Sequence, residues 1–240
     1  MNPQAMEPFG QALLAHFQGD AAAEFIIHRD DGQETALPAS IFFRDASEFT
    51  PIDRAAMDRC AGHVLDVGAG SGLHSLFLQQ KGLSVTAIDI SPQAVNVMKQ
   101  RGLADVYRAD IIDFQGGPFD TLLMLGHGIG MVETLAGLDR FLTHAHVLLT
   151  DNGQVLLDSL DVRLTDDPSN LAYQLANRRA GRYFGEIRMK VEFQDRHSPQ
   201  YGWLHVDTRT LEHHARTAGW QCETIRQETT GDHLTRLTRS

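Results

Sequence analysis

The sequence is poor in cysteine and has no excess of basic residues. Of its 240 residues only two are cysteines, Cys60 and Cys222, which form neither a CxxC pair nor a disulfide framework. Lys and Arg number 21 against 31 Asp and Glu, which gives a formal charge of -10 at pH 7. Because there is also no basic run, the composition disfavours a nucleic-acid or membrane partner that is held by charge.

Targeting signals and long apolar stretches are lacking as well. The first ten residues, MNPQAMEPFG, contain neither the basic start nor the apolar core of a signal peptide. No segment approaches the roughly twenty apolar residues that are needed to cross a bilayer. The length and an apolar content of 42% suit one globular domain with a small insertion or lid. We therefore expect a soluble, cytoplasmic protein with no membrane partner.

From Val64 onwards, short apolar strands alternate with helices. Near-continuous apolar strands in such an alternation indicate a parallel sheet that is covered on both faces. We predict an α/β protein, a Rossmann-like three-layer sandwich. Its expected strands are 64–67, 85–90, 105–110, 119–125, 154–158, 222–227 and 233–238. Its expected helices are 72–81, 92–101, 132–148 and 208–218, with a turn at 151–153.

Two segments stand outside this alternation. Residues 1–61 form an N-terminal preface, with a helix around Phe9–Phe17, a hairpin whose second strand ends at Phe43, and a helix that Thr50 and Pro51 begin. Residues 161–207 form a β-hairpin insertion around a turn at 195–200. Since insertions on the loop face of such sheets often carry specificity, we expect a lid at 1–61 and a main domain at 62–240 with a substrate-specificity insertion at 161–207.

The stretch V64-L-D-V-G-A-G-S-G72 places a glycine loop directly after the first strand. Ligands of open parallel sheets lie beyond the carboxyl ends of the strands, so this loop forms the floor of the predicted site. Gly68, Gly70 and Gly72 permit positive φ angles and let a ligand reach the backbone. A dinucleotide fingerprint needs a small residue at position 73, which is Leu, and no Gly-Lys-Ser/Thr of a Walker loop follows.

Three acidic residues lie at the ends of three consecutive predicted strands. Asp89 can accept both hydroxyl hydrogens of a ribose, and Asp110 can meet the exocyclic amine of an adenine. Asp66, directly before the glycine loop, would repel a pyrophosphate but suits an ammonium or sulfonium group. The three acids together favour a positively charged nucleoside over a phosphorylated one.

These motifs resemble those of the class I S-adenosylmethionine-dependent methyltransferases, best over about residues 62–160 and more loosely to the C-terminus. The resemblance implies a mostly parallel seven-stranded sheet with an antiparallel last strand. It implies S-adenosyl-L-methionine as cofactor and S-adenosyl-L-homocysteine as product. The glycine loop would back the methionine part, the second-strand acid would bind the ribose, and the third-strand acid would face the adenine. The implied cofactor-binding residues are Asp66, Gly68, Ala69, Gly70, Gly72, Asp89, Ile90, Asp110, Ile111, Leu125 and Gly126.

Further candidates are less specific. Arg44 could reach the methionine carboxylate if the preface folds over the site, although a solvated surface arginine is the competing interpretation. His127, in L125-G-H-G-I-G130, lies where the resemblance implies that acceptor and methyl group meet. It is our candidate for the catalytic base or acceptor-orienting group, with a merely packed loop histidine as the equal alternative. Asp158 ends the fifth strand on the same face, or else caps the segment that follows.

The sequence indicates the class of acceptor only coarsely. The Asp/Asn-Pro-Pro-aromatic motif of DNA amino-methyltransferases is absent after the fourth strand, which together with the acidic charge favours a small-molecule acceptor and no nucleic acid. Tyr183, Tyr201 and Trp203 either wall the acceptor pocket or belong to the core. We predict no metal site, because the T-H-A-H spacing at 143–146 points the two rings apart on a helix.

The leading hypothesis is therefore methyl transfer to an unidentified small molecule by in-line displacement. One alternative is a non-catalytic S-adenosylmethionine-binding sensor or scaffold. A less favoured alternative is a nicotinamide-dependent oxidoreductase, which both Leu73 and Asp66 oppose. The acceptor, the atom that is methylated and the oligomeric state are not specified by the sequence.

Overall fold

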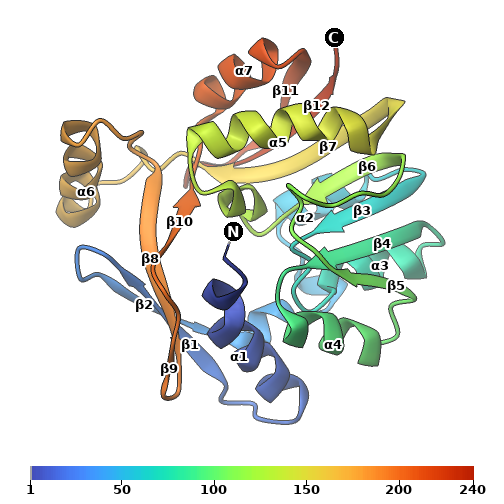
Figure 1. Cartoon of the computed structure of the whole chain (residues 1–240), viewed down its shortest axis with the longest axis horizontal. Helices are drawn as coiled ribbons and strands as arrows, with labels where there is room; N and C mark the ends of the chain where they lie inside the picture. Colours follow the sequence, from blue (N-terminus) through green and yellow to red (C-terminus); the bar gives the residue numbers. More distant parts are fainter. Residues whose placement is uncertain (1) are drawn as a thin grey trace. The chain divides into compact units, whose positions relative to one another are not determined.

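The computed structural model describes residues 2–240, which divide into two compact units (Figure 1). Unit 1 comprises residues 2–50, 62–114 and 188–201, and unit 2 comprises residues 51–61, 115–187 and 202–240. The predicted division into a lid at 1–61 and a main domain with an insertion at 161–207 is a functional one, and it stays a prediction.

The larger sheet has the strand order β11-β12-β7-β6-β3-β4-β5. β4 runs parallel to β3 and to β5, and β6 runs parallel to β7. β12 is antiparallel to both β7 and β11. The predicted seven-stranded, mostly parallel sheet with an antiparallel last strand is thus confirmed. The strands are β3 (His63–Val67), β4 (Ser84–Asp89), β5 (Asp105–Arg108), β6 (Phe119–Met124), β7 (Leu149–Leu160), β11 (Trp220–Gln227) and β12 (Asp232–Arg239).

In unit 1, the helices α3 (Leu73–Gln80) and α4 (Pro92–Gln100) pack on β4, and α4 also packs on β5. The Ser91 hydroxyl caps α4 by accepting the Ala94 amide hydrogen at 3.3 Å, and Pro92 occupies the first helical position, as the sequence predicts. The buried core of this region consists of Ala87, Val95, Met98, Leu103 and Val106.

A second, smaller sheet has the strand order β10-β8-β1-β2, with β9 paired to β8. Within unit 1, β1 is antiparallel to β2 and, on its other side, to β8, where Ile26 lies opposite Glu192. A strand of the predicted insertion therefore extends the hairpin of the preface, which the sequence did not indicate. The strands are β1 (Glu24–Arg29), β2 (Glu34–Pro38), β8 (Glu186–Phe193), β9 (Arg196–His197) and β10 (Tyr201–Leu204).

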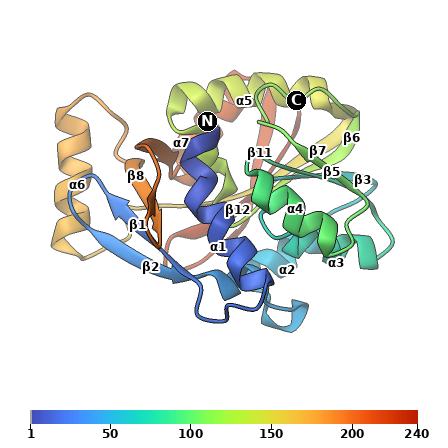
Figure 2. The same cartoon turned by 60° about the horizontal axis from the view of Figure 1, so that its bottom comes forward.

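The N-terminal helix α1 (Glu7–Phe17) lies beside α4 in both cartoon views (Figures 1 and 2). A Cβ atom added to Gly10 would come within 2.0 Å of the Ser91 hydroxyl, so the backbone of α1 lies against the first turn of α4. The Phe9 ring contacts the edges of Phe25 and Phe42, with centroids 5.3 and 5.1 Å away. Residues 2–50 of the preface are thus packed into unit 1 by their own apolar side chains.

Unit 2 contains α2 (Pro51–Met57), α5 (Leu135–Leu148), α6 (Pro168–Arg179) and α7 (Thr208–Thr217). α5 lies next to α7, and Figure 2 shows α5 and α2 on opposite faces of β7 and β12. The buried Trp220 side chain stacks on His146 at 4.0 Å, and its indole nitrogen donates a hydrogen bond to the Leu142 carbonyl at 3.0 Å. Short 3-10 helices cover Pro3–Met6, Ala39–Phe42, Ala46–Glu48 and Gly128–Val132.

Local predictions were wrong at four places. The second hairpin strand ends at Pro38, because the chain turns there and brings Phe42 onto the Phe9 ring. The expected turn at 151–153 is a bulge inside β7, since Phe119 pairs with Leu149 but Thr121 with Gln154. β9 lies within the expected turn at 195–200, and α6 was not predicted at all.

Among residues 2–240, no helix combines the length and the apolar character that a membrane span requires.

Comparison of Gly72 with Gly82 tests whether Gly72 is required for packing as well as for its backbone conformation. Gly72 and Gly82 have similar positive φ angles, 80° and 85°, but only a Cβ at Gly72 would meet other atoms, with Leu103 Cδ1 at 2.6 Å and Met98 Cγ at 3.0 Å. We expect Gly82→Ala to cost about 1–2 kcal/mol for the left-handed backbone alone. Gly72→Ala should cost about 1–3 kcal/mol more through overpacking. Urea unfolding of both variants measures the difference, and equal costs would contradict the packing role of Gly72.

Candidate functional site

The three glycines of the loop all adopt the left-handed conformation, with φ angles of 68° at Gly68, 58° at Gly70 and 80° at Gly72. Side chains disfavour this region, so the loop requires glycine for conformational reasons. A Cβ added to Gly70 would meet only Leu13 Cδ1, at 3.9 Å, within unit 1. Gly72 is therefore also needed for packing beneath the loop, whereas Gly70 is required by its backbone conformation alone.

Asp89, at the end of β4, is bonded to this loop. Its carboxylate accepts the Gly70 amide hydrogen at 2.9 Å and the Ser91 amide hydrogen at 2.8 Å. The side chain is buried, and this burial raises the pKa of Asp89 to about 6, against the opposing effect of the Ser91, Gly70 and Ile90 amides. A carboxylate offers about four lone pairs, so acceptor capacity remains for a ligand hydroxyl.

Asp66, inside β3, is the second buried carboxylate of the loop. It accepts the Ser75 hydroxyl hydrogen at 2.6 Å, and burial raises its pKa although His74 and Ser75 oppose the shift. The charge of Asp66 in turn raises the pKa of Asp89. Within the described residues neither carboxylate forms an ion pair with Lys or Arg. Two buried carboxylates without a Lys or Arg partner are stabilised when a cation binds beside them, which fits a sulfonium-bearing nucleoside.

Asp110, the acid predicted at the end of the third strand, is connected to Asp89 by a backbone hydrogen bond of the preceding residue. The Ala109 amide donates to the Asp89 carbonyl at 3.1 Å, and Asp110 follows directly. The half-buried Asp110 carboxylate accepts the Ile112 amide hydrogen at 3.0 Å, so the loop itself uses part of its capacity. The Ile111 side chain is buried and that of Ile90 is half-buried. Unit 1 thus brings the predicted residues of β3, β4 and β5 together.

One residue beside the loop, Arg101, was missed at the sequence level. The Arg101 guanidinium donates to the Ser71 carbonyl at 2.8 Å and to the Ser71 hydroxyl at 2.9 Å, and it lies 5.0 Å from the Phe43 ring centroid. Arg44, the predicted carboxylate ligand, is half-buried and donates to the Ile41 carbonyl at 2.9 Å. No motif marks Arg101, because its contact with Ser71 depends on how α4 ends.

In unit 2, the segment after β6 carries His127. Leu125 is buried, and a Cβ at Gly126 would meet nothing within 4 Å in the described residues. His127 has a positive φ angle of 58°, rare for a non-glycine residue. Its amide donates to the Asp158 carboxylate at 2.8 Å, and its Nε2 lies 2.8 Å from the Asp232 carboxylate. Two carboxylates therefore fix both the backbone and the ring of His127.

The electrostatics of this cluster separate two neighbouring histidines. Burial disfavours a protonated His127, but the hydrogen bond to Asp232 and the charge of Asp158 outweigh it and raise the pKa of His127. The same hydrogen bond lowers the pKa of Asp232 to about 2. The His205 ring packs edge-on against His127 at 5.3 Å, and burial lowers the pKa of His205 to about 3. Asp232 and His205 were missed because they lie far from His127 in the sequence.

The end of the predicted insertion packs on the same segment of unit 2. The Trp203 indole occupies the space that a Gly130 side chain would need, because an added Cβ would lie 2.1 Å from it. A Cβ at Gly202 would lie 2.9 Å from Glu133 Cβ. Within unit 2, residues 202–205 therefore cover the segment from His127 to Glu133.

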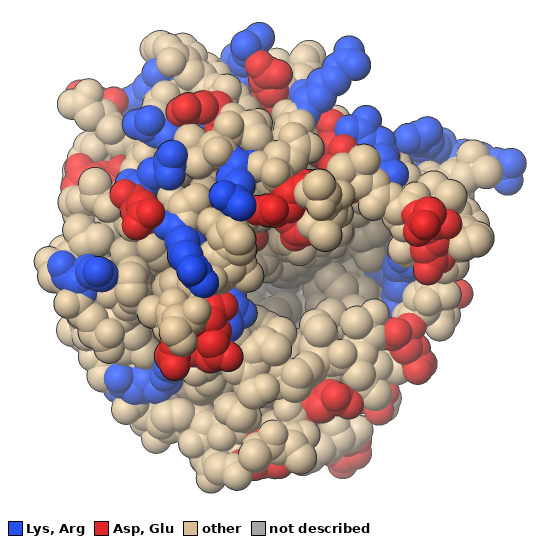
Figure 3. All heavy atoms as spheres, turned by 180° about the vertical axis from the view of Figure 1, so that it is seen from behind, with Lys and Arg blue, Asp and Glu red and all other residues tan. Residues whose placement is uncertain are grey.

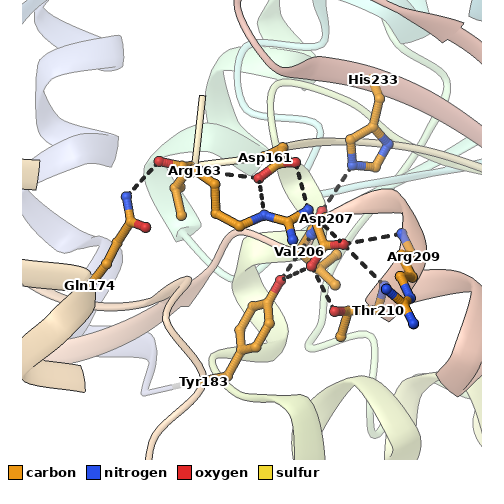
Figure 4. A network of polar contacts seen from close by, with 10 residues as sticks. Asp161, Arg163, Gln174, Tyr183, Val206, Asp207, Arg209, Thr210 and His233 are labelled. Atoms are coloured by element: carbon orange, nitrogen blue, oxygen red, sulfur yellow. Dashed lines mark hydrogen bonds and ion pairs between the residues drawn. The ribbon is translucent and has the colours of Figure 1, made fainter. Parts of the chain in front are cut away.

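A polar network anchors the other end of the insertion (Figure 4). The Tyr183 hydroxyl donates to the Asp207 carboxylate at 2.6 Å, and Arg163 bridges Asp161 and Asp207 at 2.8 and 3.1 Å. The His233 ring bonds to the Val206 carbonyl at 2.8 Å. Tyr183 is thus held by its hydroxyl, and Tyr201 is buried, which raises its pKa.

Two other histidines contact groups that are distant in the sequence. His214 pairs with Asp139 at 2.6 Å, and His146 Nε2 lies 2.8 Å from the Ala218 carbonyl. Among residues 2–240 there is no group of three or more His, Cys, Asp or Glu side chains that could hold a metal ion.

Comparison with known proteins gives a consistent family. A family model for a methyltransferase domain matches residues 43–225. The crystal structure of a SAM-dependent methyltransferase from Bacteroides fragilis, in complex with S-adenosyl-L-homocysteine, is 32% identical, covers 100% of this chain and 97% of that one, and has a TM-score of 0.87. An O-methyltransferase of ubiquinone biosynthesis from Xanthomonas oryzae pv. oryzae is 31% identical over 115 residues, 45% of this chain and 46% of its own length.

A methyltransferase with a different kind of acceptor in its name matches as well. The 23S rRNA (uracil(747)-C(5))-methyltransferase of Pyrococcus abyssi is 32% identical over 102 residues, which are 42% of this chain and 24% of that protein. The chain spans less than half the length of these curated relatives. Because a methyltransferase model matches most of the chain, and a relative of known structure aligns with all of it, the chain belongs to the class I S-adenosylmethionine-dependent methyltransferases.

Proposed function

We propose that this protein transfers the methyl group of S-adenosyl-L-methionine to a small-molecule acceptor. The observation that carries the proposal is the pair of buried carboxylates, Asp66 and Asp89, beside the glycine loop, because neither of them pairs with Lys or Arg in the described residues. A cationic nucleoside offsets this buried negative charge, whereas a pyrophosphate would add to it. The relative from Bacteroides fragilis, which holds S-adenosyl-L-homocysteine, supports the same ligand class.

Each donor-binding residue has a role in this proposal. Asp89 accepts the ribose hydroxyl hydrogens, and Asp66 lies toward the cationic end of the donor. Asp110 bonds to the adenine amine, and Arg44 pairs with the methionine carboxylate. The backbone of the glycine loop and the apolar side chains near it complete the set, namely Gly68, Ala69, Gly70, Gly72, Ile90, Ile111, Leu125 and Gly126. The preface, residues 1–61, acts as the lid.

The chemistry requires few catalytic groups. A bound sulfonium supplies an electrophilic methyl group, and holding the acceptor in line with it provides much of the rate. We assign His127 as the base for an acceptor that must lose a proton. Its Nε2–H donates to Asp232, so Nδ1 of the neutral ring carries the free electron pair that takes up this proton. Asp158 holds the His127 backbone through its amide.

Charge and packing support a small acceptor over a nucleic acid. The formal charge is -10, and on the face of the described residues drawn in Figure 3 the Lys and Arg side chains are interspersed with Asp and Glu. The insertion, residues 161–207, selects the acceptor through Tyr183, Tyr201 and Trp203. Its last residues already pack on the segment that contains His127. Both cysteines are free thiols, which is compatible with the cytoplasm as the place of action.

The first prediction concerns the ribose contact. Asp89→Ala removes the carboxylate that accepts the diol and the Gly70 amide, and we expect it to weaken S-adenosyl-L-homocysteine binding at least thirtyfold, about 2 kcal/mol. Isothermal titration calorimetry measures the affinity. Asp58→Ala, which removes an exposed carboxylate in unit 2, serves as the matched control and should bind normally. Unchanged binding by Asp89→Ala would remove Asp89 from the donor site.

The second prediction concerns pH. Because the ligand-free pKa of Asp89 is about 6, most of its carboxyl groups are protonated at pH 5 and cannot accept both ribose hydrogens. Affinity for S-adenosyl-L-homocysteine should therefore fall about tenfold between pH 7 and pH 5. Binding at pH 6 should release protons, which calorimetry in buffers of different ionisation enthalpy detects. A flat pH profile in the wild type, equal to that of Asp89→Asn, is the contrary result.

The raised pKa has the opposite effect on the ligand-free protein. A carboxyl whose pKa is raised from 3.8 to about 6 on folding contributes stability below pH 3.8 and loses it as the pH rises through 6. Stability and donor affinity thus change in opposite directions over this window. Urea midpoints at pH 4.5 and 7 are expected to differ more in the wild type than in Asp89→Asn.

The third prediction concerns the base. Asp232→Asn removes the hydrogen-bonded charge that favours protonated His127, so we expect the pKa of His127 to fall. NMR titration of the imidazole, assigned with a His127→Gln variant, measures this shift. Asp139→Asn breaks another His–Asp pair, that with His214, and should leave His127 unchanged. If the pKa of His127 is unchanged in Asp232→Asn, Asp232 does not raise the pKa of the proposed base.

A further inference from the structure

Arg101 is bonded to the centre of the glycine loop from outside the motif. It follows α4 directly, and one of its terminal nitrogens donates to both the carbonyl and the hydroxyl of Ser71. Ser71 is 1% exposed and lies between Gly70 and Gly72, both left-handed. The orientation of the peptide unit after Ser71 is thus fixed by a charged donor, which forms stronger hydrogen bonds than a neutral one.

The same serine links the loop to the preface. Its hydroxyl donates to the Phe42 carbonyl while accepting from Arg101, which uses the donor and one acceptor position of the group. The Arg101 guanidinium also lies 5.0 Å from the Phe43 ring centroid, within range of a cation–π contact. Arg44 comes next in the chain and donates back to the Ile41 carbonyl. Residues 41–44 are therefore tied to the glycine loop through Arg101 and Ser71.

The contacts of Arg101 with Ser71 and with segment 41–44 persist over the physiological pH range. Burial lowers the pKa of Arg101, yet a guanidinium remains protonated at any physiological pH, so the contact is not a pH switch. α1 adds a second contact between the preface and the nucleotide-binding strands, because Gly10 lies against Ser91, two residues after Asp89. Segment 41–44 itself also contacts α1, because the Phe9 and Phe17 rings pack on Phe42 and Phe43.

We propose that Arg101 is a positioning residue for the methyl donor, which fixes the glycine loop through Ser71 and makes an ordered segment 41–44 a condition of tight donor binding. The inference rests on the proposed function of the loop as the donor site. It assigns to Arg101 no contact with the donor. Its effect is on the free energy of binding, because a loop that is not pre-ordered must be ordered when the donor binds.

The test compares S-adenosyl-L-homocysteine binding by four proteins in calorimetry. Arg101→Met keeps an unbranched apolar stem but loses the donors, and we expect it to weaken binding about tenfold, or about 1.4 kcal/mol. Arg101→Lys keeps the charge and one donor group, and should restore part of the affinity. Lys99→Met removes an exposed charge from the same helix and should bind as the wild type does. Wild-type affinity in Arg101→Met would overturn the proposal.

Hydrogen exchange separates positioning from general destabilisation. In the wild type, S-adenosyl-L-homocysteine should slow amide exchange in the peptide that contains residues 41–44, and this protection should be lost in Arg101→Met while α5 exchanges as before. If Arg101→Met fails to fold, Ser71→Ala provides the test, because it breaks only the hydroxyl contacts and should weaken binding about threefold. Failure of the wild type to bind would contradict the proposed function itself, whereas normal binding with normal protection in the variants would contradict only the role of Arg101.

Discussion

The hydrogen bond from the Gly70 amide to the Asp89 carboxylate is the constraint on which the proposed donor site depends. It joins the left-handed glycine loop to the end of the neighbouring strand, so that loop and acid move as one unit. The Ser91 amide, at the start of α4, bonds to the same carboxylate. Loop, strand and helix are thus fixed by one buried acid, whose desolvation is offset by two backbone donors. Asp66 adds a second negative charge that a cationic ligand would balance.

In unit 2, carboxylates again fix a neighbouring group, which here is the histidine His127. His127 is held in an unfavourable backbone conformation by Asp158 and in one ring orientation by Asp232. Backbone strain of this kind persists only where surrounding contacts enforce it, and it is frequent at functional sites. His205, beside it, is kept neutral by burial. The pKa values of the two rings are therefore shifted in opposite directions although their centroids are 5.3 Å apart.

The sequence predicted those features that local patterns encode. The alternation of strands and helices, the glycine loop and the capped start of α4 were all recovered, and the sheet with its antiparallel last strand followed from the family resemblance. Features that depend on distant pairing were not recovered. Asp232 lies 105 positions from its partner His127, and Arg101 lies 30 positions from Ser71. No sequence motif marks either of these two pairings. The start of helix α6 does carry a local sequence pattern, because Asp167 is the N-cap and Pro168 occupies the first helical position.

The pairing of β1 with β8 has a consequence for how the chain is made. His28 and Glu192, which bond across these strands, are separated by 164 positions. During synthesis the edge of β1 has no partner until most of the chain has left the ribosome, and an unpaired strand edge is a template for aggregation. Until then, nascent chains rely on the hairpin with β2 and on the charged rim of Glu24, Arg29 and Glu34. Recombinant fragments that stop before residue 186 would carry this open edge permanently.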